Sequence, residues 1–130
     1  MVFKKVLIID DELEFCHVVK MYFEMTLKSN FQVSIALEGK EGIRLAKRIK
    51  PDLIILDIIM PVMDGFKVLE TLKQDPDTMS IPVVILSAKI DAESKLKAMQ
   101  LYNDMYINKP VAMLDLKAKV EEVLKMRGIE

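Results

Sequence analysis

The sequence has a single cysteine, Cys16, and a formal net charge of −1 over 130 residues. One cysteine cannot form an intramolecular disulfide, which fits a reducing compartment. The balanced charge, without a run of one sign, argues against a nucleic-acid-binding surface, which needs a basic patch. The apolar run that leads to Asp10 is only four residues long (6–9), too short for a signal-peptide core or a membrane span. We therefore expect a cytoplasmic protein without direct contacts to nucleic acid or membrane.

The length suits one folded domain. A chain of 130 residues that is 52% hydrophobic and 30% charged is typical of a globular domain with a substantial core. Two ordinary domains would need a longer chain. We therefore expect residues 1–130 to form a single domain.

Five short apolar runs alternate with segments of helical periodicity. The runs are residues 6–9, 31–35, 53–56, 83–86 and 105–107, and most are apolar on both faces, as in buried parallel strands. Apolar residues recur at helical spacing within residues 13–27, 43–49, 66–72, 92–99 and 116–124. Asp64 is the expected N-cap of the third helix. The alternation predicts an α/β fold with a doubly wound, five-stranded parallel sheet and helices on both faces.

Polar side chains follow four of the five predicted strands. Asp10 and Asp11 follow the first strand, Asp57 the third and Ser87 the fourth, and Lys109 comes after the fifth. In an open α/β sheet, functional sites form at the carboxyl ends of the strands. The sequence therefore predicts that three carboxylates, a hydroxyl group and an ammonium group meet at one edge of the sheet.

This set of groups suits phosphoryl chemistry. Three carboxylates in one cleft repel each other, so their pKa values rise unless a cation joins them. Mg²⁺ is a hard cation that prefers carboxylate oxygens and water as ligands. A carboxylate can attack phosphorus, while a metal ion and Lys109 neutralise the charge on the transferring oxygens. The alternative for Asp10 and Asp11 alone is a helix N-cap.

Four motifs carry a resemblance to a known family. They are the acidic pair Asp10-Asp11, the stretch Leu-Asp-Ile-Ile-Met-Pro-Val-Met-Asp-Gly at residues 56–65, Leu-Ser-Ala at 86–88, and Tyr-Ile-Asn-Lys-Pro at 106–110. Each motif alone is weak, but the four occur in order, each after its own strand. Along essentially its whole length the chain resembles the receiver domain of bacterial response regulators. The resemblance implies a flavodoxin-like (βα)5 fold with strand order 2-1-3-4-5.

The resemblance also implies a role for each site residue. Asp57 would accept the phosphoryl group, and the expected Mg²⁺ ligands are the carboxylates of Asp10, Asp11 and Asp57 with the backbone carbonyl of Ile59. The remaining implied roles are phosphate binding by Ser87, by Lys109 and by the backbone of Ala88, switching by Ser87 and Tyr106, and a cis peptide bond before Pro110.

Partners follow from the same resemblance. The phosphoryl donor would be a sensor histidine kinase or a phosphotransfer protein. Phosphorylation would change the surface formed by the fourth helix, the fifth strand and the fifth helix, where a downstream protein target would bind. The domain would be a monomer or a phosphorylation-dependent dimer, and its only catalysis would be its own phosphoryl transfer and slow autodephosphorylation. Two cellular roles stay open, a stand-alone regulator of the chemotaxis type and a phosphorelay intermediate.

Two pairs of residues depart from the family pattern. A glycine and a small residue commonly precede the fifth strand, and here Tyr102 and Asn103 stand there. The aromatic residue that often follows the Lys-Pro pair is replaced by Val111-Ala112. Both pairs flank the predicted partner surface, so they bear on which partner binds and leave the phosphorylation site intact.

Three other functions fit the sequence less well. A non-phosphorylated scaffold of this fold is expected to lose the acidic pair, the acceptor or the lysine, and this chain keeps all three. A phosphatase with an aspartyl nucleophile is expected to carry a second aspartate where Ile59 stands. A dinucleotide-dependent oxidoreductase needs a glycine-rich turn after the first strand, and none of the four glycines lies there.

Overall fold

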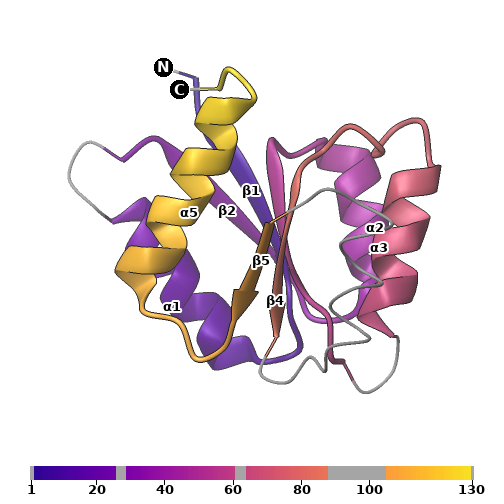
Figure 1. Ribbon diagram of the computed structural model, residues 1–130, viewed down its shortest axis with the longest axis horizontal. Coiled ribbons are helices and arrows are strands. Elements are labelled where there is room, and N and C mark those ends of the chain that lie inside the picture. The colour runs from indigo at the N-terminus through magenta and orange to yellow at the C-terminus, as the bar shows by residue number, and fades with distance from the viewer. Residues whose placement is uncertain (1, 26–28, 61–63, 88–104, 130) are drawn as a thin grey trace.

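The computed structural model describes residues 2–25, 29–60, 64–87 and 105–129, with the backbone alone described for Ser87 (Figure 1). The strands are β1 (Lys4–Ile9), β2 (Phe31–Ala36), β3 (Leu53–Asp57), β4 (Val83–Ser87) and β5 (Met105–Asn108). The helices are α1 (Leu13–Glu24), α2 (Gly39–Ile49), α3 (Gly65–Gln74) and α5 (Met113–Met126). The helix predicted within residues 92–99 lies outside the described residues, as do Ala88, Tyr102 and Asn103.

All five strands pair in parallel, in the order β2-β1-β3-β4-β5. The doubly wound sheet that the sequence predicts is therefore confirmed, including the strand order. Register brings Ile9 of β1 beside Leu56 of β3, and Asp57 beside Leu86 of β4. The residues that follow these strands consequently leave the sheet at the same edge.

Two apolar layers cover the two faces of the sheet. Successive side chains of a strand point to opposite faces, so Val6 and Ile8 of β1 pack with α1 and α5, whereas Leu7 and Ile9 pack with α2 and α3. Figure 1 shows α1 and α5 on one side of the sheet and α2 and α3 on the other. Because both faces are covered, the central strands are apolar at successive positions instead of alternating with polar residues.

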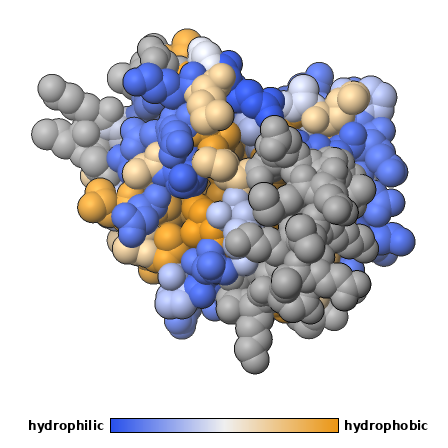
Figure 2. Space-filling view, viewed as in Figure 1, coloured by the Kyte–Doolittle hydropathy of each residue, from blue (hydrophilic) through white to orange (hydrophobic). Residues whose placement is uncertain are grey.

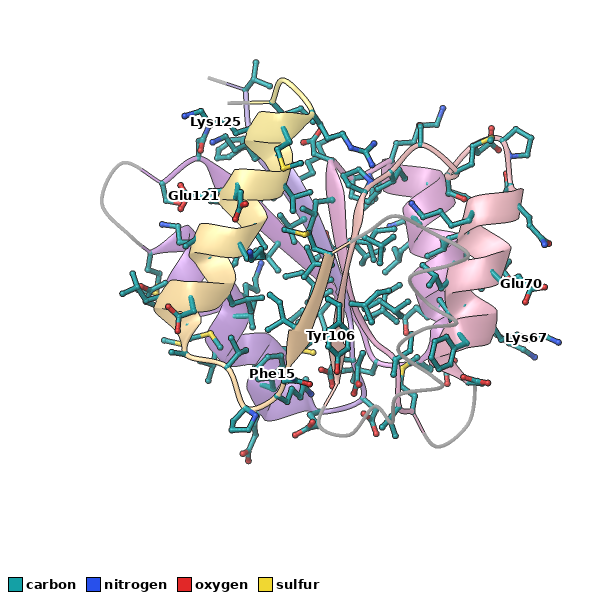
Figure 3. The ribbon with its side chains drawn as sticks, viewed as in Figure 1. Phe15, Lys67, Glu70, Tyr106, Glu121 and Lys125 are labelled. Carbon is teal, nitrogen blue, oxygen red and sulfur yellow. The ribbon has the colours of Figure 1, made fainter. Side chains whose placement is uncertain are left out.

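The two sides of the molecule differ at their surfaces. On the face seen in Figure 2, hydrophobic side chains reach the surface where α1 and α5 lie, while α3, at the right edge of the view, presents mostly hydrophilic atoms. In Figure 3, Lys67 and Glu70 of α3 point away from the sheet. The exposed large hydrophobic residues of α1 and α5 are Leu13, Val18, Met21, Leu114 and Met126, and none of those described belongs to α2 or α3.

Gly65 sets the path of the chain after β3. Its N–H donates to Ile58 O at 3.0 Å, and a Cβ atom added to Gly65 would lie 2.3 Å from Ile58 Cα. Only glycine fits such an approach of two backbones. Asp64 caps the helix as predicted, since its Oδ1 accepts from Phe66 N at 2.9 Å. This tight return fixes the segment that leaves Asp57 at the edge of the sheet.

The helices do not begin and end at the residues where the apolar periodicity of the sequence begins and ends. α2 begins at Gly39, four residues before the first apolar position, and α1 ends at Glu24, before the periodic pattern does. Periodicity marks only the buried stripe of a helix. The polar turns at the ends of a helix, such as residues 39–42, therefore escape it.

Candidate functional site

Three carboxylates converge at the carboxyl ends of β1 and β3. Asp10 follows β1 and is fully buried, Asp57 ends β3 and is 4% exposed, and Asp11 is exposed to solvent. One oxygen from each carboxylate lies within 4.8 Å of the others. The structure therefore brings together the three aspartates that the sequence predicts as metal ligands.

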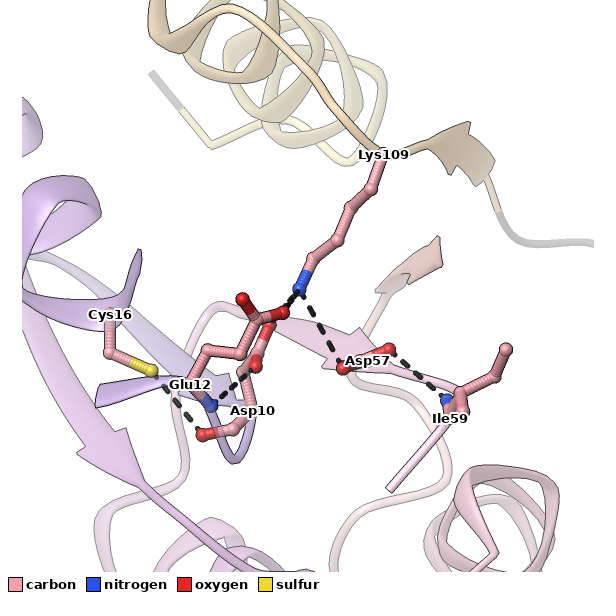
Figure 4. Close-up of polar contacts among 6 residues, drawn as sticks. All are labelled: Asp10, Glu12, Cys16, Asp57, Ile59 and Lys109. Atoms are coloured by element: carbon pink, nitrogen blue, oxygen red, sulfur yellow. Dashed lines mark hydrogen bonds and ion pairs between the residues drawn. The ribbon is translucent and has the colours of Figure 1, made fainter. Parts of the chain in front are cut away.

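Lys109 reaches this cluster from beyond β5 (Figure 4). Its Nζ lies 2.8 Å from Asp10 Oδ2, 2.7 Å from Glu12 Oε1 and 3.6 Å from Asp57 Oδ2. The Lys109 side chain is only 10% exposed, so water screens its pairs with Asp10 and Asp57 poorly. Lys109 is thus a fixed positive charge directly beside the predicted acceptor.

The pKa values of the two buried aspartates, Asp10 and Asp57, are raised. Burial raises the pKa of Asp57 to about 6, and the charges of Asp10 and Asp11 add to this, against a hydrogen bond from Ile59 N and the charge of Lys109. Burial likewise raises the pKa of Asp10. Burial alone would lower the pKa of Lys109, but its hydrogen bonds to carboxylates raise it instead. A further cation brought into the cleft would therefore favour the ionised form of Asp57 and lower its pKa.

The cleft can hold a small polar ligand. A cavity of about 280 Å³ is lined by Asp11, Glu12, Asp57, Ile59 and Lys109. Four carboxylates, counting Asp10, face one ammonium group, so the site carries an excess of negative charge. Hard divalent cations are bound by clustered carboxylate oxygens of this kind. The donor set present therefore fits a divalent cation such as Mg²⁺.

Backbone contacts orient the two buried aspartates. Asp57 Oδ1 accepts from Ile59 N at 3.1 Å, so its Oδ2 is the oxygen on the side of Lys109. Asp10 Oδ1 accepts from Glu12 N at 2.9 Å. The N-cap residue of α1 is Glu12, without a side-chain cap. The helix-cap alternative for the acidic pair is therefore not what the structure shows, although Asp10 does stabilise the turn into the helix.

The other predicted site residues lie at the same edge where they are described. Ser87 ends β4, beside Asn108 of β5. Tyr106 of β5 is half-buried, and its hydroxyl donates to Asn108 Oδ1 at 2.6 Å. The Lys109–Pro110 peptide bond is cis. The Ser87 side chain and the Ala88 backbone lie outside the described residues, so their predicted contacts stay predictions.

Sequence reasoning missed two neighbours of Lys109. Glu12 pairs with its ammonium group, and the Phe15 ring centroid lies 4.5 Å from Nζ. Figure 3 shows Phe15 and Tyr106 at the same end of the molecule. Glu12 directly follows the acidic pair, which is a signal that could have marked it. Nothing in the spacing of Phe15 separates it from a core residue. Cys16 of α1 is fully buried, and burial raises the pKa of its thiol to about 12.

Comparison with known proteins decides the family. Residues 6–121 match the model of the response regulator receiver domain. The chain belongs to the response regulator receiver domain family. The resemblance seen in the four sequence motifs is therefore confirmed, and the chain is a receiver domain of two-component signal transduction.

Curated relatives are longer than this chain. The transcriptional regulatory protein PrrA of Mycobacterium leprae is 36% identical over 126 residues, which cover 95% of this chain and 51% of that protein. The alkaline phosphatase synthesis transcriptional regulatory protein PhoP of Bacillus subtilis is 32% identical, over 97% of this chain and 50% of its own. This chain thus spans about half the length of these relatives.

Solved receiver domains share the whole fold. A CheY-like receiver domain protein from Methanospirillum hungatei superposes with a TM-score of 0.88 at 25% identity, covering 97% of each chain. The receiver domain of the Francisella response regulator 1452 gives 0.83 at 30% identity, over 95% of this chain and 98% of that one. In the part of this chain that the structure describes, no helix has the length and apolar character needed to cross a membrane.

Proposed function

We propose that this domain accepts a phosphoryl group on a carboxylate oxygen of Asp57, and that phosphohistidine on a sensor histidine kinase or phosphotransfer protein donates it. The observation that carries the proposal is the position of the buried Asp57 carboxylate. It lies 3.6 Å from Lys109 Nζ and shares its cleft with the carboxylates of Asp10 and Asp11. A carboxylate beside a fixed cation and further oxygen ligands is suited to attack phosphorus.

The transfer is a displacement at phosphorus. An electron pair on an Asp57 oxygen forms the new O–P bond while the N–P bond of the phosphohistidine breaks. The imidazole nitrogen keeps the electrons of that bond and takes a proton from solvent. Lys109 stays beside Asp57 and pairs with a phosphoryl oxygen of the product, because no other described ammonium group lies this close to the carboxylate.

Asp10, Asp11 and Asp57 would hold a Mg²⁺ ion, together with the backbone carbonyl of Ile59. The mixture of buried and exposed carboxylates suits an ion that keeps several of its waters. When bound, the ion would neutralise charge on the transferring oxygens. The raised pKa of Asp57 supports this assignment, because a cation would favour the ionised carboxylate that performs the attack.

Phosphorylation would act as the switch. A phosphoryl group adds close to two negative charges and three strong acceptor oxygens. The Ser87 hydroxyl and the Ala88 backbone N–H would bind these oxygens, and Tyr106 would turn inward from its contact with Asn108. These movements would change the surface formed by β5, α5 and the helix predicted within residues 92–99, where a downstream protein target would bind.

The domain would work by protein contact in the cytoplasm, without direct contact to nucleic acid or membrane, as a monomer or a phosphorylation-dependent dimer. Residues 1–130 would form one receiver domain that acts as a stand-alone regulator or as a phosphorelay intermediate. If these residues belong to a longer protein, the domain would instead control an attached output domain, since the curated relatives are transcriptional regulators of about twice this length. The receiver domain itself would catalyse only its own phosphorylation and slow autodephosphorylation.

Intact-mass measurement tests the proposal. The wild type, Asp57→Asn and Asp115→Asn would each be incubated with acetyl phosphate, with Mg²⁺ or with a chelator. Asp115 is an exposed aspartate in the first turn of α5 and serves as the matched control. We expect one added phosphoryl group on the wild type and on Asp115→Asn, only when Mg²⁺ is present, and none on Asp57→Asn.

A phosphoryl group on Asp57→Asn would overturn the assignment of the acceptor. If no variant gains mass, the phosphohistidine form of a histidine phosphotransfer protein would be tried as donor. A wild type that neither donor phosphorylates, and that Mg²⁺ does not stabilise, would be a scaffold with the receiver fold.

A further inference from the structure

β2 is the last strand on its side of the sheet, so one side of its backbone has no neighbouring strand. Lys4 N donates to Asn30 O at 2.8 Å, and Asp10 N donates to Ala36 O at 3.0 Å. In a parallel pair, alternate residues direct both their N–H and their C=O toward the same neighbour. The even-numbered residues of β2 therefore face β1. Phe31, Val33 and Ile35 direct theirs outward, away from the sheet.

Two side chains from α1 occupy both outward groups of Val33. Glu24 Oε2 accepts from Val33 N at 2.7 Å, and Lys20 Nζ donates to Val33 O at 2.8 Å. Lys20 and Glu24 also pair with each other at 2.9 Å, one helical turn apart. The pair thus reproduces, at the middle of the three outward-facing residues, the two hydrogen bonds that a neighbouring strand would make.

The preceding outward-facing residue, Phe31, also has a side-chain partner for its N–H. Phe31 N donates to Ser29 Oγ at 3.2 Å. Three outward-facing backbone groups, the N–H of Phe31 and both groups of Val33, therefore have side-chain partners. An unpaired strand edge is a template on which another chain can add a strand. The side-chain hydrogen bonds to Phe31 and Val33 remove that template, because they occupy backbone groups that an added strand would need.

We propose that the Lys20–Glu24 pair closes the β2 edge against strand addition, and that the partner it excludes is β2 of a second copy of this chain. In an antiparallel pairing about a two-fold axis at Val33, the two copies of Val33 would exchange both N–H···O=C bonds. Those bonds need the same N–H and C=O that Glu24 and Lys20 occupy. The contacts of Lys20 and Glu24 with Val33 and the pairing of two β2 strands are therefore mutually exclusive.

A second copy is the partner that fits because the outward groups of β2 complement themselves. Phe31, Val33 and Ile35 have the β-branched and aromatic character that favours strand pairing. The resulting contact would be isologous and would join two five-stranded sheets into one. The proposal is independent of the proposed function, since no group of the acidic cleft takes part in it.

Sedimentation velocity over a range of protein concentrations tests the proposal, with no phosphoryl donor present. The test variant is the double substitution Lys20→Ala/Glu24→Ala. The control is Lys47→Ala/Asp75→Ala, which removes an ion pair of 2.8 Å between α2 and the end of α3 and the same number of charges. We expect wild type and control to sediment alike, and the test variant to self-associate roughly tenfold or more tightly, because two backbone groups lose their partners.

Glu24→Gln is the conservative variant. Glutamine keeps a side-chain oxygen that can accept from Val33 N, so this variant should sediment like the wild type. A folded test variant, judged by circular dichroism, that sediments like the wild type at every concentration would overturn the proposal. Self-association of the wild type as strong as that of the test variant would overturn it as well.

Amide hydrogen exchange gives a second readout that does not depend on the variant folding. In the wild type, the Val33 amide should exchange roughly tenfold more slowly than the Ile35 amide, which also faces outward. Equal exchange rates at the two amides would contradict the proposal. In the associated test variant the Val33 amide should be protected again, and association that leaves it unprotected would place the contact on another surface.

Discussion

Replacing Asp57 with asparagine should stabilise the domain at neutral pH when no metal ion is present. The Asp57 carboxylate is buried, and burial raises its pKa from 3.8 to about 6. At about 1.4 kcal/mol per pH unit, this rise means that the ionised carboxylate costs the fold on the order of 3 kcal/mol. Asparagine has the same shape and carries no charge, so it removes that cost and keeps an acceptor for Ile59 N–H.

The pH dependence has a definite sign. Because the pKa of Asp57 is raised in the folded state, its contribution to stability is fully present below pH 3.8 and is lost as the pH rises through about 6. The stability gained by Asp57→Asn should therefore be near zero at pH 4. It should grow between pH 4 and 6 and level off above about pH 7.

Urea unfolding of both proteins in a chelator, at several pH values, measures this difference. Addition of Mg²⁺ should stabilise the wild type more than the variant, by about 2.7 kcal/mol at a concentration one hundred times the dissociation constant if the variant does not bind the ion. A difference in unfolding free energy that does not change with pH, or a less stable variant at pH 7, would refute the reasoning. Either result would mean that burial does not penalise the Asp57 carboxylate.

Three further predictions concern single substitutions. Lys109→Met should raise the pKa of Asp57 further, because it removes the only described cation near that carboxylate, and NMR titration measures this pKa. The same substitution should slow phosphorylation by acetyl phosphate, which intact-mass measurement follows over time. Gly65→Ala should lower the free energy of unfolding by about 1–3 kcal/mol or more, since its Cβ would collide with the Ile58 backbone; urea unfolding measures this, and an unchanged midpoint would contradict it. Phe23→Ala should cost about 3–5 kcal/mol in the same assay, because Phe23 is fully buried, and a loss below about 1 kcal/mol would show a loosely packed core.

The fold could be predicted because its signals are local. Continuous apolar runs such as residues 53–56 mark strands buried on both faces, and helical periodicity marks the segments between them. Parallel strands place their carboxyl ends at one edge, so the meeting of Asp10, Asp57 and Lys109 could be predicted from their places in the chain alone. The strand order needed the family resemblance, because no local pattern states which strands are neighbours.

Contacts that depend on the exact course of the chain could not be predicted. Glu12 and Lys109 are 97 residues apart, and their ion pair depends on how α1 begins after β1. The bonds from Lys20 and Glu24 to Val33 depend on how α1 lies against β2, and in the sequence these residues look like an ordinary ion pair on a helix surface. Helix periodicity reports which face is buried, but not which polar side chains reach a strand edge.

The most direct test of the central claim is chemical trapping of the phosphorylated residue. Borohydride reduces an aspartyl phosphate to homoserine, so peptide mass spectrometry after reduction reads the acceptor from the sequence. After incubation with Mg²⁺ and acetyl phosphate, the account predicts homoserine at position 57 and at no other aspartate. Homoserine at position 10 or 11, or a phosphorylated protein without homoserine at position 57, would contradict it.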